Sequence, residues 1–166
     1  MLTGNFRKRQ TGFTYLTILF AIAVVGVLLA RTGIDWSQAS QREKERELLF
    51  VGNQYRQAIA LYYERTPGAF KRYPTKLEDL LADSRYNPPQ HYLRKLYRDP
   101  VTNSQQWGPI IAPEGGIMGV HSLSDATTLK RANFDYADRT LEGAAKYADW
   151  MFAYSPQPMV LNQPRP

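Results

Sequence analysis

The chain has 166 residues, no cysteine and a formal net charge of +6 at pH 7. The absence of cysteine excludes disulfide bonds and cysteine-ligated metal centres. The length suits a long helix with one modest globular domain. Most of the 11 prolines follow residue 66, which indicates an irregular, loop-rich C-terminal half.

The N-terminal region combines a short basic segment, Arg7–Arg9, with an uncharged apolar run, Phe13–Ala30. As a helix this run is about 27 Å long, enough to cross the hydrocarbon core of a membrane. We therefore predict a transmembrane helix over residues 13–30. Because cationic flanks stay in the cytoplasm, the C-terminal part should face outward. Unlike a secretory signal, the run is preceded by Gly12 and has no small-residue cleavage site after it.

The same helix is expected to continue over residues 31–65, because no proline interrupts it. Charges alternate over residues 42–47, where Glu43 and Arg46 form an i,i+3 pair. This pattern favours a solvated helical face, with salt bridges between subunits as the alternative. Apolar side chains then recur at three- or four-residue steps and predict a face buried against a sheet. They are Leu48, Val51, Tyr55, Ile59 and Tyr62.

A globular domain is expected over residues 66–155. Thr66-Pro67-Gly68 should end the long helix, because proline cannot continue it. Thr75 and Glu78 have the spacing of a capping box at the start of a short helix.

Two antiparallel strands are predicted over residues 107–112 and 116–123, joined by a turn at 113–115. A last helix is predicted over residues 138–152, where small and apolar residues share one face. Residues 156–166 are proline-rich and are expected to form a flexible tail. The fold class is therefore α+β, a long helix packed on a small antiparallel sheet with an additional C-terminal helix.

The Gly12-Phe13-Thr14 junction, with its basic leader and apolar run, resembles the class III signal of type IV prepilins. The resemblance implies that a prepilin peptidase removes residues 1–12 and methylates the new N-terminus, Phe13. The family usually has Glu at the fifth residue after the cut, where this chain has Thr17. That Glu is thought to neutralise the N-terminal amine of a neighbouring subunit, so Thr17 marks a filament contact without the charge. Losing the leader would also lower the net charge from +6 to +3.

Two further phrases resemble the major pseudopilin of type II secretion. They are Tyr-Pro-Thr-x-Leu-x-x-Leu at residues 73–80 and Tyr-Leu-x-x-Leu-x-x-Asp-Pro at residues 92–100. The resemblance runs over residues 13–123 and implies a type IV pilin-like fold. It also implies a single-pass protein of the bacterial inner membrane whose periplasmic domain assembles into a filament that drives protein export. The implied partners are the prepilin peptidase, other pseudopilins, the inner-membrane platform protein and its secretion ATPase.

The resemblance ends after Leu123, where major pseudopilins usually have a glycine-containing loop that binds calcium. Asp125, Asp135 and Asp138 are weak candidates for such a site, and an ordinary polar loop is the favoured interpretation. No other cofactor is expected.

No metal-ligand spacing, phosphate loop or nucleophile motif is present, so we do not expect an enzyme. One alternative is a minor pilin of a type IV pilus or competence system, with a cationic aromatic patch that contacts DNA. Its residues would be Lys71, Arg72, Tyr73, Tyr92, Arg94, Lys95, Tyr97 and Arg98. Loop solubility explains these cations more simply, and no nucleic-acid partner is expected. The other alternative is a plain single-pass anchored protein with an uncleaved helix.

Overall fold

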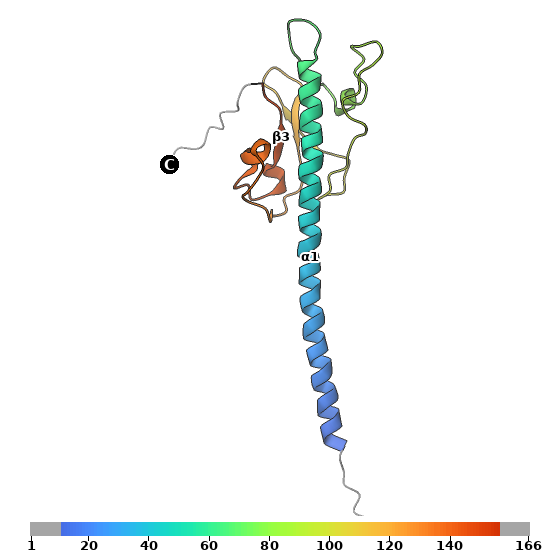
Figure 1. Cartoon of the computed structure of the whole chain (residues 1–166), viewed down its shortest axis with the longest axis vertical. Helices are drawn as coiled ribbons and strands as arrows, with labels where there is room; N and C mark the ends of the chain where they lie inside the picture. Colours follow the sequence, from blue (N-terminus) through green and yellow to red (C-terminus); the bar gives the residue numbers. More distant parts are fainter. Residues whose placement is uncertain (1–10, 157–166) are drawn as a thin grey trace, which may run out of the picture. The chain divides into compact units, whose positions relative to one another are not determined.

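The computed structural model describes residues 11–156, with side chains for residues 14–26 and 36–156 (Figure 1). The chain divides into two compact units, Met1–Ser40 and Gln41–Pro166. The helix α1, Thr11–Glu64, runs through both units. The long helix expected over residues 13–65 is therefore confirmed. The predicted leader and most of the predicted tail lie outside the described residues.

The second unit contains a three-stranded antiparallel sheet in the order β1-β2-β3. Its strands are β1 (Gly108–Ile111), β2 (Ile117–His121) and β3 (Met151–Ala153). The predicted hairpin is confirmed: Gly108 pairs with His121, and the turn closes where the Gly115 N–H donates to the Ala112 carbonyl at 2.9 Å. Gly115 and Gly116 have φ angles of +94° and +85°, which glycine adopts without strain. A bulge lies between Ile110 and Ile111.

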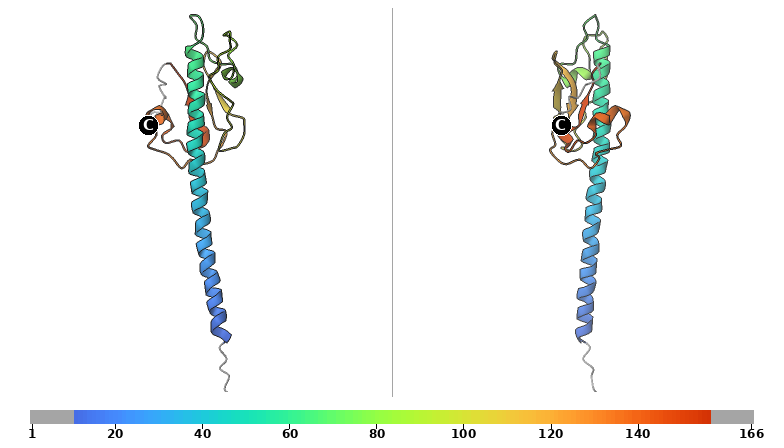
Figure 2. Two further views of the ribbon diagram at one scale, coloured as in Figure 1. Left: turned by 45° about the vertical axis from the view of Figure 1, so that its right-hand side comes forward. Right: turned by 90° about the vertical axis from the view of Figure 1, so that its left-hand side faces the viewer.

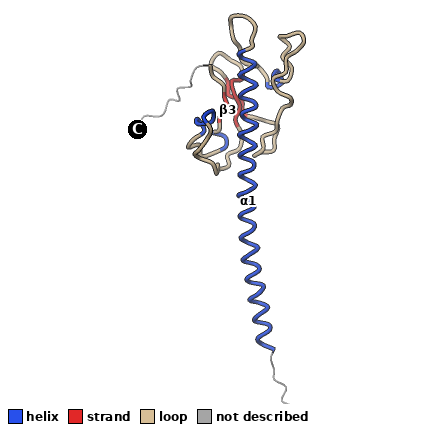
Figure 3. The backbone as a smooth tube through the Cα atoms, in the orientation of Figure 1, coloured by secondary structure: helices blue, strands red, loops and turns tan. Residues whose placement is uncertain are grey.

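The sheet packs against the second part of α1, as Figures 2 and 3 show. The predicted apolar stripe forms the helical side of this core, and all five of its residues are buried. The closest approach is at Gly52, where an added Cβ would lie 2.4 Å from the ring of Phe152 on β3. A helix this close to a strand requires glycine at that position.

The predicted C-terminal helix over residues 138–152 is wrong. Two short 3-10 helices and β3 occupy this region: η2 (Tyr136–Leu141) and η3 (Tyr147–Asp149). Gly143 has a φ of +78°, which a helix cannot contain. The backbone groups after it bond to residues 124–131 instead of to the preceding helical turn.

The short helix after the loop is also smaller than predicted, and is the 3-10 helix η1 (Leu77–Leu80). Its first turn is capped by Asp79 and not by Glu78. The Asp79 carboxylate accepts hydrogen bonds from Thr75 N, Thr75 Oγ1 and Lys76 N at 3.1, 2.9 and 3.0 Å. A tighter helix brings the third residue of the turn back toward the cap.

The predicted inner-membrane location, with a single span and a periplasmic C-terminal domain, is contradicted. Among the side chains that the structure describes, no helix provides a run long and apolar enough to cross a membrane. The described apolar run, residues 14–26, is shorter than the ~20 residues that a span requires. Residues 27–30 of the predicted span are outside the described side chains.

Candidate functional site

The first part of α1 carries apolar side chains that nothing in the first unit covers. Leu16, Ile18, Phe20 and Ile22 are 65%, 58%, 72% and 64% exposed, and Val25 is 53% exposed. Contiguous exposed apolar surface of this kind marks a site of interaction with another apolar surface. We call residues 14–26 the apolar segment.

The predicted processing site lies at the start of this segment. Gly12 and Phe13 are in the first turn of α1, and their side chains are outside the described residues. Thr17 is exposed within the apolar segment. Cleavage after Gly12, methylation of Phe13 and the filament contact at Thr17 therefore remain predictions.

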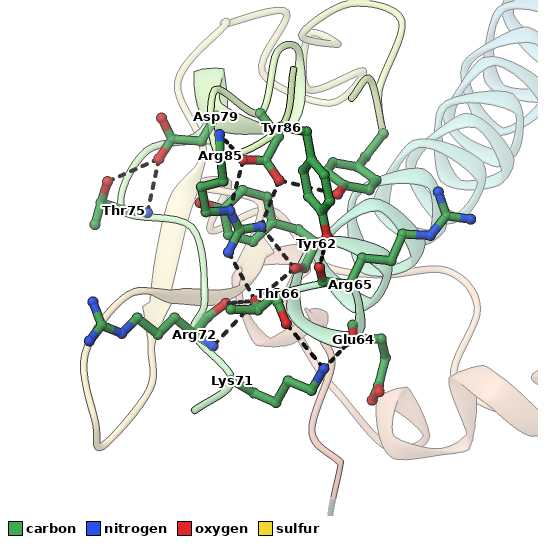
Figure 4. Close-up of polar contacts among 12 residues, drawn as sticks. Tyr62, Glu64, Arg65, Thr66, Lys71, Arg72, Thr75, Asp79, Arg85 and Tyr86 are labelled. Carbon is green, nitrogen blue, oxygen red and sulfur yellow. Dashed lines mark hydrogen bonds and ion pairs between the residues drawn. The ribbon is translucent and has the colours of Figure 1, made fainter. Parts of the chain in front are cut away.

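The C-terminal end of α1 is held by a network centred on Arg85 (Figure 4). The Arg85 guanidinium binds both carboxylate oxygens of Asp83, at 2.8 and 2.7 Å. It also donates to Thr66 Oγ1 at 2.9 Å and to the Tyr62 carbonyl at 3.1 Å. A cation at this position satisfies the last carbonyls of a helix and complements its dipole.

Asp83 is the buried member of this network, with a side chain only 1% exposed. Burial alone would raise the pKa of its carboxyl group, but the hydrogen bonds and charge of Arg85 outweigh it and hold that pKa below its usual value. The Tyr92 hydroxyl donates to the same carboxylate at 3.1 Å, which raises the pKa of Tyr92 to about 12 together with burial. The network thus fixes residues 83–92 against the end of α1.

Glu45 connects the other end of the second unit to α1. It is 4% exposed, although it lies in the charged run that the sequence places in solvent. Its Oε1 accepts hydrogen bonds from Leu129 N at 2.6 Å, Lys130 N at 3.2 Å and Tyr147 Oη at 3.1 Å. The sequence holds a signal for this burial, because Glu45 precedes Leu48 by three residues and extends the apolar stripe by one turn.

The three calcium candidates have separate positions and roles. Asp138 is 4% exposed, and its carboxylate binds Arg56 Nη1 at 2.8 Å and Asn53 Nδ2 at 3.0 Å. Asp125 forms an exposed ion pair with Lys146 at 2.9 Å. Asp135 is exposed at the start of η2. Among the described residues there is no group of three or more His, Cys, Asp or Glu side chains that would hold a metal ion.

Asp99, within the Asp-Pro phrase, is a buried residue that sequence reasoning did not assign. Its carboxylate accepts hydrogen bonds from Val101 N at 2.9 Å, Thr102 Oγ1 at 2.8 Å and Ser122 Oγ at 2.7 Å. These bonds tie the segment before β1 to the end of β2. The Asp-Pro phrase therefore has a structural role in this fold.

The cationic aromatic patch that would bind DNA is not assembled as a surface of exposed rings. Tyr73 is 5% exposed and donates to the Tyr154 carbonyl at 3.2 Å. Lys71 donates to the Glu64 carbonyl at 2.6 Å and to the Thr66 carbonyl at 3.3 Å, at the end of α1. The patch therefore lacks the stacking platforms that nucleic-acid binding uses.

Comparison with known proteins gave no match: no family model, no curated protein and no solved structure resembles the chain significantly. The described residues define an α+β protein in which a long helix carries a small antiparallel sheet. Its polar networks hold the second unit together, and its apolar segment is left uncovered.

Proposed function

We propose that this chain is a pseudopilin-like subunit of a filament that drives protein export, of the type II secretion class. In this proposal the fold is pilin-like, and the apolar segment of α1 packs against the same segment of other subunits. The observation that carries the proposal is the exposed apolar segment on a helix that continues, in the second unit, as the support of a small sheet.

The physical reason is the cost of leaving that segment in water. Burying one Leu, Ile, Val or Phe side chain gains about 1.5–3 kcal/mol, and the segment exposes several of them. A bundle of identical helices covers all of them at once. Processing after Gly12 would remove the basic residues at the N-terminus, which would otherwise repel one another in such a bundle. The partners are then the prepilin peptidase, other pseudopilins, the platform protein and the secretion ATPase.

The absence of native cysteine makes a direct test of helix packing possible. Leu16→Cys and Val25→Cys place one thiol at each end of the apolar segment. We expect oxidation of the full-length double variant to give a ladder of oligomers, because each thiol meets a different neighbour. Each single variant can give dimers at most.

Two controls define the result. Ile18→Asp in the double-cysteine chain puts a charge into the bundle and should abolish the ladder. A chain with Leu16→Cys and Arg94→Cys, the second thiol being on an exposed loop, should not give one. A double variant that stays monomeric while its second unit keeps its native circular dichroism would refute the proposal.

A further inference from the structure

Two surfaces of the second unit carry its most exposed aromatic side chains among the described residues: Phe70, 82% exposed, and Tyr136, 86% exposed. Each stands beside unpaired charge, and the charges have opposite signs. Exposed aromatics next to charged groups are typical of the anchors of protein interfaces.

The first surface, which we call the loop surface, consists of Arg65, Phe70 and Arg72 after the end of α1. The base of this loop is fixed, because Thr66 Oγ1 donates to the Tyr62 carbonyl at 3.0 Å and receives Arg85 at 2.9 Å. Figure 4 shows the guanidinium groups of Arg65 and Arg72 reaching away from that network. Among the described residues neither group has a hydrogen-bond or ion-pair partner. A fixed loop loses little entropy on binding.

The second surface, the η2 surface, consists of Asp135, Tyr136 and Glu142. Asp135 and Glu142 flank η2 at its two ends, and both are exposed. Within the described part of the chain, neither carboxylate has an ion pair or a side-chain hydrogen bond. The neighbouring Asp138 is bound to Arg56, which fixes η2 on α1 at 2.8 Å.

The two surfaces belong to one unit and lie at different levels along α1. η2 is attached at Asn53 and Arg56, and the loop starts at Thr66. Ten residues of helix separate Arg56 from Thr66, about 15 Å along the axis. One surface therefore cannot fold onto the other within the same chain without breaking a network that fixes it.

We propose that the loop surface of one copy docks on the η2 surface of the next copy. The cations Arg65 and Arg72 then face the carboxylates of Asp135 and Glu142, and Phe70 packs with Tyr136. Because the two surfaces differ, the contact is heterologous, and repetition gives an open chain of subunits instead of a closed dimer. This inference rests on the proposed filament function and specifies the contact between its globular units.

The test uses two cysteine variants of the full-length chain, Ala69→Cys beside Phe70 and Ala137→Cys beside Tyr136. Both positions are exposed. Equal amounts of the two variants, differing in size by an affinity tag, are mixed under assembly conditions and oxidised. We expect the mixed dimer to exceed each like-with-like dimer by about tenfold. In the control, Ala82→Cys replaces Ala69→Cys, and no such excess should form.

Charge reversal tests the chemistry of the contact. Arg72→Asp in the loop-surface chain should lower the mixed dimer by about tenfold, because like charges then oppose each other. Asp135→Arg in the other chain should restore it. Arg94→Asp is the matched control and should leave the yield unchanged. These substitutions remove no bond that the structure describes, and thermal unfolding of each variant checks that the second unit still folds. Phe70→Ala, which changes no charge, should also lower the yield.

The outcomes separate this inference from the proposed function. A helix ladder from Leu16→Cys/Val25→Cys without an excess of the mixed dimer would overturn the inference and leave the filament proposal standing. A mixed dimer that forms equally with Ala82→Cys would also overturn it. Loss of both the ladder and the mixed dimer would overturn both.

Discussion

At the scale of single residues, buried polar groups connect α1 to the rest of the second unit. Asp83 and Arg85 bind the last turn of the helix, and Glu45 binds the segment around Leu129. In each case a carboxylate on one segment accepts bonds from groups far away along the sequence or from an arginine that bridges to the helix. Removing one partner leaves the other buried without compensation, so these positions should be sensitive to substitution.

Asp83→Ala should destabilise the second unit by about 3–5 kcal/mol, because Arg85 then remains partly buried without its carboxylate. Urea unfolding followed by circular dichroism measures this. The matched control is Glu43→Ala, whose partner Arg46 is 75% exposed and whose loss should cost less than about 1 kcal/mol. Equal losses for the two variants would contradict the assigned role of Asp83.

The same residue predicts a dependence of stability on pH. Because its pKa is lowered in the folded state, the stabilisation from Asp83 is complete above its ordinary value of 3.8. It is lost as the pH falls through the lowered, folded-state pKa. The free energy of unfolding of the native chain should therefore fall more steeply below about pH 4 than that of Asp83→Asn. Parallel acid limbs would count against a lowered pKa.

At the scale of elements, local pattern and long-range pairing compete. The stripe from Leu48 to Tyr62 and the turn at Gly115 are local signals, and the structure follows both. Residues 138–152 have a helical pattern, but their backbone pairs with residues 124–131. A single sequence does not show such pairing in advance, so β3 and the 3-10 helices were not predictable from periodicity.

The candidate site divides in the same way. The apolar segment is visible in the sequence as an uncharged run. The Asp83–Arg85 network is not, because it depends on the chain returning to the end of α1 after residue 66. Glu45 is intermediate: charge patterning places it in solvent, while its spacing from Leu48 places it on the buried face.

Gly52→Ala tests how closely α1 packs on β3. The added Cβ would lie 2.4 Å from Phe152, so overpacking should destabilise the second unit by about 1–3 kcal/mol despite better helix propensity. Gly26→Ala is the control, because nothing lies within 4 Å of its Cβ position among the described residues. It should add helicity worth up to about 1 kcal/mol. Thermal unfolding and helical circular dichroism compare the two, and a neutral Gly52→Ala would contradict the packing described.

At the scale of the whole molecule, aromatic side chains supply much of the core, and the chain has 11 tyrosines. Burial raises the pKa of Tyr55 and Tyr73 to about 12. For Tyr154 the main cause of a pKa of about 12 is its hydrogen bond to Glu64, followed by burial. Folding therefore favours the protonated phenols.

These groups should make the protein sensitive to alkali. Since their pKa values are raised above the ordinary 10.0, their stabilisation is present below pH 10 and is lost as the pH rises through 12. We expect tyrosinate absorbance to appear in two phases, with the second phase accompanied by loss of native circular dichroism. A single titration near pH 10 with no unfolding would contradict the assignment.

The central claim is that the chain is a processed filament subunit. The most direct measurement is the intact mass and N-terminal peptide of the protein purified from the cells that produce it. Our account predicts a chain that begins at N-methylated Phe13, because the prepilin peptidase has cut after Gly12. A chain that retains Met1 or Leu2 would contradict processing, and with it the assembly of the apolar segment into a filament.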